Sequence, residues 1–298
     1  MKRAVFFDWE AVFAPEYGGN LCCLAWRGHD ILRPPPTPEA LDANRVLYGF
    51  PVLFPAGRIR DGRFSYRGNS FSLPVNEPAR GTHVHGVANG RPWRMEEPGG
   101  DVRRMIFDYG ADAPEFAGFP CSFRLALDYR FRPDAVEQLL TVTNTGDAVF
   151  PCCPGFHTEF CAPARVRIAE AGCWEIEDAR KLATGKKIPW TDFRPDRWFV
   201  PDDRMHSLQF AAPETAPAAE IEWDFGALFY TVDPKFRDWC VWNPEAGCGF
   251  IALEPYAAVG GALNLPDPER FGVLPLAPGE SAVYRSEFRM IPRPGVRA

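Results

Sequence analysis

The chain has 298 residues, of which 46% are hydrophobic and 24% are charged, a composition typical of soluble globular proteins and unlike that of disordered chains. Its 39 acidic residues outnumber its 33 lysines and arginines, so that the formal net charge is -6. This balance argues against nucleic acid or an anionic membrane surface as the partner, because both require concentrated positive charge. A neutral small molecule is the expected ligand.

The N-terminus and the cysteines indicate the compartment. Asp8 and Glu10 interrupt the apolar stretch that a signal peptide would need, and no later segment approaches the roughly 20 apolar residues of a membrane span. The nine cysteines show no C-x-x-C spacing, so we expect reduced, mostly buried thiols. Together these features predict a cytoplasmic protein.

Strand-like segments recur along the whole chain, and they are short, apolar or alternating, and rich in β-branched and aromatic residues. In chain order, clear examples are Leu21–Trp26, Ser122–Phe131, Val136–Thr143 and Gly249–Leu253. The turn-forming sequence Arg132-Pro133-Asp134-Ala135 lies between the second and the third and predicts an antiparallel hairpin. With 31 prolines and 26 glycines spread through the sequence, helices have little room.

No Ser/Gly linker, charge run or internal repeat divides the chain. We interpret the Pro34–Pro38 stretch and the Ala211–Ala219 segment as loops. Large all-β proteins often use more than 200 residues in one unit. The sequence therefore predicts a single all-β domain over residues 1–298, a large antiparallel two-sheet β-sandwich with a concave face for a ligand.

Three polar islands interrupt the strand-like sequence. They are Arg80–Gly86, Gly155–Phe160 and Ala252–Pro255, and they contain His85, His157 and Glu254 respectively. A histidine and a glutamate in one cleft can give a proton to one oxygen while taking a proton from another. Such a pair suits the opening and closing of a sugar ring.

The two histidines of the first island admit another interpretation, and an arginine before this island is a further candidate. His83 and His85 are two apart on an extended segment and would point the same way, as zinc ligands do. The other histidines, His29, His157 and His206, lack metal-motif spacing, so we predict no metal. Arg58, which follows a glycine and precedes a hairpin, could donate several hydrogen bonds to hydroxyl groups.

At this point the sequence resembles the aldose 1-epimerase (galactose mutarotase-like) family over most of its length. The early pattern of a proline and an Arg-Ile before a Gly-x-Phe hairpin is similar to Pro55–Phe64, and an asparagine, a His-Gly and an aromatic residue are similar to Asn76, His85-Gly86 and Trp93. The ending from Leu274 to Phe288 resembles the last hairpin of the family.

The resemblance implies a role for each candidate residue. His157 would act as general acid towards the ring oxygen, and Glu254 would act as general base on the anomeric hydroxyl. Arg58 and His85 would hold the sugar, and Asp196 would accept hydrogen bonds from its hydroxyls. The implied protein is a cofactor-independent isomerase, a monomer or homodimer, that interconverts the α and β anomers of a free hexose.

Several alternatives stay open. Asp192 lies four residues before Asp196 and could take its place. The activity could be that of a hexose-6-phosphate epimerase, which an arginine cluster near C6 of the sugar would distinguish, or the protein could bind sugars without catalysis. General acid/base chemistry favours catalysis, provided that the histidine is protonated near neutrality and the glutamate is ionised, a pairing that their mutual proximity would favour.

Two further expectations concern the walls of the site. Aromatic residues at Trp242, Tyr256 and Phe160 could stack on the apolar face of a sugar. Where the family often has Pro-Tyr after the acid histidine, this chain has Thr158-Glu159. We expect this extra carboxylate beside the site to bind hydroxyls or to repel an acidic sugar.

Overall fold

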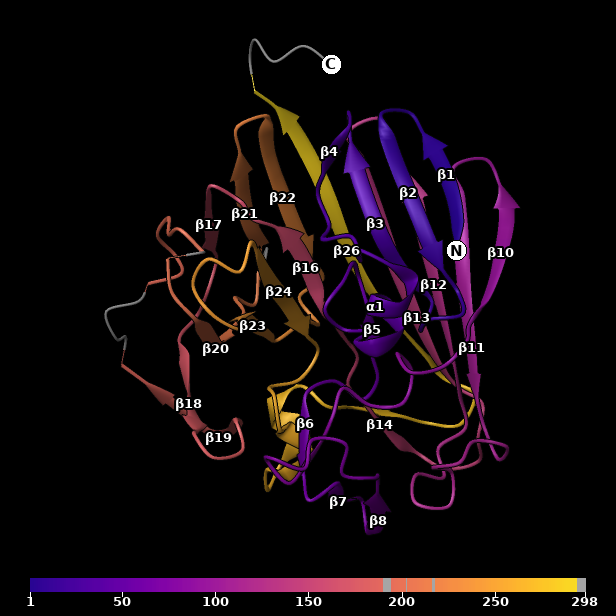
Figure 1. The fold of residues 1–298 in the computed structure, drawn as a ribbon. Coiled ribbons are helices and arrows are strands. Elements are labelled where there is room, and N and C mark those ends of the chain that lie inside the picture. The colour runs from indigo at the N-terminus through magenta and orange to yellow at the C-terminus, as the bar shows by residue number, and fades with distance from the viewer. Residues whose placement is uncertain (190–193, 202, 216–217, 294–298) are drawn as a thin grey trace.

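The computed structural model describes residues 1–189, 194–201, 203–215 and 218–293 (Figure 1). Strands make up nearly all of its regular structure, and every pair of neighbouring strands in a ladder is antiparallel. This confirms the predicted all-β, antiparallel class.

One layer of the sandwich is an eight-stranded sheet in the order β10-β11-β12-β13-β26-β22-β21-β17. Its strands are β10 (Arg94–Gly99), β11 (Val102–Tyr109), β12 (Phe123–Phe131), β13 (Ala135–Asn144), β26 (Ser281–Pro292), β22 (Gly226–Val232), β21 (Ala218–Trp223) and β17 (Arg165–Ile168). The predicted hairpin is confirmed, because β12 and β13 pair from Phe131 opposite Val136 to Phe123 opposite Asn144.

The facing layer is built from two sheets. A four-stranded sheet holds β1 (Lys2–Phe6), β2 (Trp9–Ala14), β3 (Asn20–Trp26) and β4 (His29–Asp30). The second sheet has the order β19-β18-β20-β23-β24-β15-β5, and β16 also pairs with β24. Its strands are β19 (Leu182–Ile188), β18 (Cys173–Glu177), β20 (His206–Ala211), β23 (Asp238–Asn243), β24 (Phe250–Tyr256), β15 (Gly155–Phe156), β16 (Thr158–Cys161) and β5 (Val52–Leu53). Single bridges pair Leu21 of β3 with Phe50, just before β5, and Phe160 of β16 with Leu32, just after β4, so that the two sheets lie side by side.

Most of the remaining short elements lie towards one end of the sandwich, whereas the α-helix lies nearer its middle in this view (Figure 1). Three two-stranded sheets are β6 (Arg58–Arg60) with β9 (Thr82–Val84), β7 (Arg63–Tyr66) with β8 (Asn69–Ser72), and β14 (Phe150–Cys152) with β25 (Leu274–Leu276). The helices are α1 (Pro38–Ala43) and the 3-10 turns η1 (Ala262–Asn264) and η2 (Pro268–Phe271). The proline stretch, which was expected to be a loop, leads into α1. Thr37 is the N-cap of this helix, and Pro38 occupies its first turn, where proline fits.

Aromatic side chains fill the space between the layers. Phe6 of the four-stranded sheet stacks on Phe131 of β12 at 4.1 Å between ring centroids, and Phe160 of β16 meets Phe288 of β26 at 5.7 Å. Because Phe160 faces this core, the alternation of a strand turns Glu159 and His157 to the opposite side. The outer face of the second sheet therefore carries the polar residues of the island around His157.

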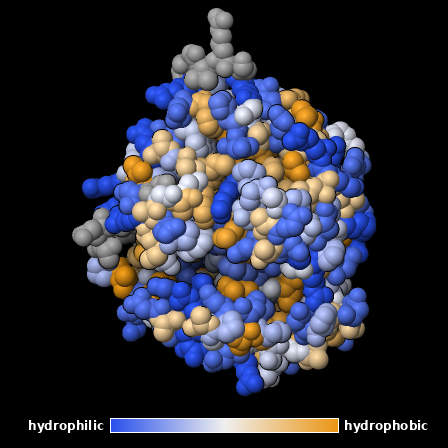
Figure 2. Space-filling model, in the orientation of Figure 1, coloured by the Kyte–Doolittle hydropathy of each residue, from blue (hydrophilic) through white to orange (hydrophobic). Residues whose placement is uncertain are grey.

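The surface in this view mixes hydrophilic and hydrophobic residues without one broad apolar area (Figure 2). Within the described residues, no helix is long and apolar enough to cross a membrane. All nine cysteines are separate thiols, and five of them are buried.

Candidate active site

The register of the second sheet places His157 opposite Glu254. Gly155 pairs with Tyr256 and Thr158 pairs with Leu253, and the same register sets His157, which lies between β15 and β16, across from Glu254. On the other side of β24, Glu254 pairs with Cys240 of β23. Adjacent positions on neighbouring strands point to one face, so these side chains form a row across the sheet.

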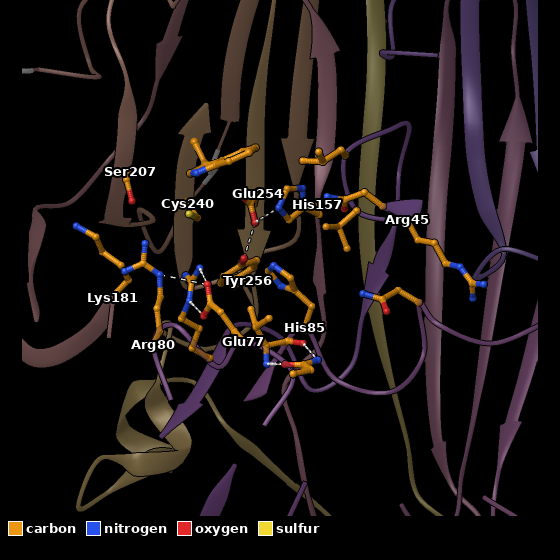
Figure 3. A pocket seen from close by; sticks show the side chains of 18 of the residues that line it. Arg45, Glu77, Arg80, His85, His157, Lys181, Ser207, Cys240, Glu254 and Tyr256 are labelled. Carbon is orange, nitrogen blue, oxygen red and sulfur yellow. Dashed lines mark hydrogen bonds and ion pairs between the residues drawn. The ribbon is translucent and has the colours of Figure 1, made fainter. Parts of the chain in front are cut away.

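Short contacts join the acid and base candidates. Nε2 of His157 lies 3.4 Å from Oε2 of Glu254, and the side chains are 6% and 2% exposed. The hydroxyl of Tyr256, two residues further along β24, donates a hydrogen bond to the same Glu254 oxygen (Figure 3). The imidazole and the carboxylate thus meet edge to edge on the floor of a cavity.

His85 reaches this floor from another part of the chain. Its ring centroid is 5.1 Å from that of His157, and the two rings are nearly perpendicular. The chain turns back here in the left-handed region, with φ of 66° at His85 and 71° at Gly86. A Cβ on Gly86 would lie 2.0 Å from the carbonyl oxygen of Phe54, so only glycine fits at this position.

Arg58 is fixed by a carboxylate that also lines the cavity. Glu77 accepts two hydrogen bonds from Arg58, at 2.8 and 3.0 Å, one from Arg80 at 3.2 Å and one from the Thr82 hydroxyl at 2.6 Å. Burial opposes the charge on Arg58, but the bonds to Glu77 outweigh it and raise the pKa of Arg58. The guanidinium is therefore charged and held in one place.

These groups line one cavity of about 690 Å³, a volume typical of small-molecule sites. Figure 3 shows the side chains converging on it from strands of the second sheet and from the loops at its end. Its lining includes Arg45, Arg58, Asn76, Glu77, Arg80, His85, Asn89, His157, Lys181, Ser207, Gln209, Cys240, Trp242, Glu254 and Tyr256. The arrangement can donate a proton from one side of a small polar ligand and accept a proton beside it.

The comparisons with known proteins agree with this arrangement. A family model described as aldose 1-epimerase matches residues 10–289. The chain belongs to the aldose 1-epimerase family. Among solved structures, a galactose mutarotase-like protein from Clostridium acetobutylicum is similar with a TM-score of 0.91 at 22% identity, covering 98% of this chain and 95% of the other. Galactose 1-epimerase from Lactobacillus acidophilus NCFM is also similar, with a TM-score of 0.78 at 15% identity, covering 97% of this chain and 93% of the other. These structural likenesses show the fold.

In this aldose 1-epimerase family member, the structure brings together four of the five predicted site residues. Arg58, His85, His157 and Glu254 line the same cavity. Asp196 does not line it: its side chain is exposed and forms an ion pair with Arg194 at 2.7 Å. The expected contact between Asp196 and a sugar is therefore not supported. The carbonyl of the neighbouring Pro195 accepts a hydrogen bond from Ile168 of β17, which is the edge strand of the other layer. Asp192 lies outside the described residues.

Two other sequence expectations need correction. Phe160 is fully buried in the core between the layers and cannot stack on a ligand, whereas Trp242 and Tyr256 do line the cavity. His83 does not share the face of His85, because β9 ends at Val84 and His83 Nδ1 lies 2.7 Å from the carbonyl oxygen of Pro74. Among the described residues, no three His, Cys, Asp or Glu side chains group as metal ligands.

The ionisation of the pair also differs from the expectation. Burial lowers the pKa of His157, and the nearby Glu254 only partly opposes this. Burial raises the pKa of Glu254, and His157 and the Tyr256 hydroxyl oppose it in part. Proximity does favour the charged forms, as expected, but desolvation outweighs it. His157 is therefore mainly a neutral imidazole at neutral pH.

The structure adds residues that the sequence did not reveal. Ser207 and Gln209 of β20 lie beside Trp242 and Cys240 in the sheet and point into the cavity. The alternation of Ser207 and Gln209 with the apolar Leu208 and Phe210 was the available signal. Glu77 had no comparable signal, because its importance depends on Arg58, 19 positions earlier in the chain.

Proposed function

We propose that this protein is a cofactor-independent aldose 1-epimerase that interconverts the α and β anomers of a free hexose. The observation that supports this most directly is the 3.4 Å separation between Nε2 of His157 and Oε2 of Glu254 on the floor of a ligand-sized cavity. Two such atoms are close enough to act on the two oxygens of a single hemiacetal carbon. The family and the fold agree with this proposal.

In the proposed reaction, Glu254 accepts the proton of the anomeric hydroxyl while His157 Nε2 gives a proton to the ring oxygen. The bond between C1 and the ring oxygen opens, and the aldehyde rotates about the bond from C1 to C2. Closure from the other face then reverses both proton transfers. Arg58 and His85 would hold the sugar during the rotation, and Trp242 would provide an apolar wall.

The charge of the cavity favours an uncharged hexose over a hexose 6-phosphate. Four cationic side chains line the cavity, but each one lies beside a carboxylate. Arg58 and Arg80 contact Glu77. Likewise, Arg45 contacts Asp42 and Lys181 contacts Asp178. A phosphate group would have to compete with these carboxylates for its donors.

A carbohydrate-binding protein without activity would not need an acid and a base that meet at one point. Hydroxyl recognition requires donors and acceptors distributed around the ring, which the Arg58 and Ser207 positions could supply by themselves.

The nine unpaired thiols agree with a reducing compartment, so we propose that the reaction takes place in the cytoplasm.

Polarimetry of freshly dissolved aldoses tests the proposal. We expect the purified protein to accelerate the equilibration of at least one free hexose more than it accelerates that of the 6-phosphate. Glu254→Gln should lower kcat by about 10²- to 10⁴-fold, the usual contribution of a general base. Glu245→Gln, which changes an exposed carboxylate, is the matched control and should behave like the wild type. If no aldose is accelerated, or if Glu254→Gln retains full activity, the proposal is wrong.

A further inference from the structure

Glu159 lies behind the imidazole of His157. The two residues are on the same face of the sheet, two positions apart, and Oε1 of Glu159 is 2.9 Å from Nδ1 of His157. Glu159 is fully buried and is not part of the cavity lining. The expectation that this carboxyl group meets sugar hydroxyls is therefore wrong: His157 separates it from the ligand.

The contact is the only polar one that the Glu159 side chain makes with the described part of the chain. It has the length of a hydrogen bond but not the alignment, and Nδ1 and both carboxyl oxygens have no hydrogen-bond partner among the described residues. Catalytic hydrogen bonds are often poorly aligned without substrate. Burying a carboxyl group without a hydrogen-bond partner costs folding free energy, so the presence of Glu159 beside the proposed catalytic imidazole calls for a chemical explanation.

The state of His157 supplies that explanation. An imidazole that is mainly neutral has one ring proton, and a proton on Nδ1 would leave nothing on Nε2 to give to a sugar. Burial raises the pKa of Glu159 well above its usual value, and only the charge of Arg33 opposes this. A protonated Glu159 has one hydroxyl proton to donate, and Nδ1 of His157 lies within hydrogen-bond distance of Oε1, at 2.9 Å.

We propose that Glu159 is a positioning residue whose carboxyl proton faces Nδ1 of His157, so that the proton of the imidazole stays on Nε2 and points into the cavity. The proposal rests on the function proposed above. It makes His157 a proton donor without requiring an imidazolium ion.

The protons and charges balance through the ring-opening step. The O–H bond of Glu159 breaks as an N–H bond forms at Nδ1, and the N–H bond at Nε2 breaks as an O–H bond forms on the ring oxygen. The anomeric hydroxyl loses its proton to Glu254 as the bond between C1 and the ring oxygen cleaves. His157 is neutral before and after, and the single negative charge moves from Glu254 to Glu159. On ring closure, Glu254 gives its proton to the aldehyde oxygen, Nε2 of His157 takes the proton of the ring-closing hydroxyl, and the Nδ1 proton returns to Glu159.

Charged and titratable neighbours are compatible with this transfer. Arg33 precedes α1, its guanidinium lies over the Phe250 ring at 3.7 Å, and its charge stabilises an ionised Glu159. Glu254, on β24, interacts with Glu159 through space: an ionised Glu159 raises the pKa of Glu254, so one negative charge on the two groups is favoured over two. On the cavity side, the charge of Arg58 acts on His157 and disfavours an imidazolium ion.

Nitrogen NMR of the histidine rings tests the proposal without any substrate. In ¹⁵N-labelled wild-type protein at pH 8, we expect the His157 ring, assigned by the signal lost in His157→Asn, to show the neutral tautomer with the proton on Nε2. A proton on Nδ1 overturns the proposal. If no sugar is turned over, the proposed function fails, but this measurement still decides the role of Glu159.

Kinetics of Glu159→Gln provide the second test. The amide can still donate to Nδ1 but cannot release its proton, so we expect kcat at pH 8 to fall by about tenfold or more, with little change in KM. The remaining activity should now require an imidazolium ion and should decline as the pH rises through the pKa of His157, which burial holds below its ordinary value. A wild-type kcat and pH profile overturns the proposal.

Glu137→Gln is the matched control, because Glu137 is another buried glutamate, lies in β13 of the other layer and is outside the cavity lining. We expect it to keep the kcat and the pH profile of the wild type. If it reproduces the changes of Glu159→Gln, the effect belongs to any buried amide and the proposal is wrong.

Discussion

Replacement of Glu77 by glutamine tests how Arg58 is held at the cavity. The substitution preserves the shape of the side chain but removes the negative charge that accepts hydrogen bonds from Arg58, Arg80 and Thr82. The amide keeps one acceptor oxygen and directs an NH₂ group towards donors. We therefore expect Arg58 to lose its fixed position, and KM for the sugar to rise more than kcat falls.

The magnitude follows from the burial of the pair. The side chains of Arg58 and Glu77 are 26% and 23% exposed. Breaking a fully buried ion pair costs about 3–5 kcal/mol, and an exposed pair contributes about 0.2–1 kcal/mol. The intermediate exposure and the two hydrogen bonds from Arg58 place the expected loss in the free energy of unfolding at about 2–3 kcal/mol.

Urea denaturation measures this loss as a shift of the midpoint at constant slope. Asp108→Asn is the matched control, because Asp108 also accepts two hydrogen bonds from an arginine, Arg124, but the two side chains are 55% and 50% exposed. It should cost about 0.5 kcal/mol or less. Equal losses in Glu77→Gln and Asp108→Asn would refute the reasoning from burial.

Three further predictions concern the floor of the site and the buried group behind it. Gly86→Ala should abolish activity and lower the melting temperature far more than Gly279→Ala, because both glycines have positive φ but only the first has a backbone atom in the way of a Cβ; similar melting temperatures would contradict this. Tyr256→Phe removes a hydrogen bond that lowers the pKa of Glu254, so the acid limb of the kcat profile should move to higher pH, and an unmoved limb would count against that role. The raised pKa of Glu159 means that the folded state keeps a proton that the unfolded state loses as the pH rises above about 4.3. The stability of the wild type should therefore fall relative to that of Glu159→Gln by about 1.4 kcal/mol per pH unit up to the folded pKa, and parallel denaturation curves across pH would rule this out.

The local pattern of the sequence predicted the fold class, and together with the family resemblance it predicted most of the site. Alternation and turn residues predicted the β12–β13 hairpin, because both signals are read within a few neighbouring residues. The islands around His85, His157 and Glu254 stood out because polar residues interrupted apolar strands. Their convergence in one cavity was implied by the family resemblance and is confirmed by the lining of the cavity.

The structure decided what depends on contacts between distant segments. Only the pairing of β15 and β16 with β24 sets His157 across from Glu254, and only the packing around Glu159 turns an expected ligand contact into a buried group behind the imidazole. Asp196 shows the opposite case, since an acidic residue near a suitable motif lies at an exposed turn. The identity of a residue fixes which protons it can exchange, but strand register and desolvation, which the whole chain determines, fix where it points and whether it is charged.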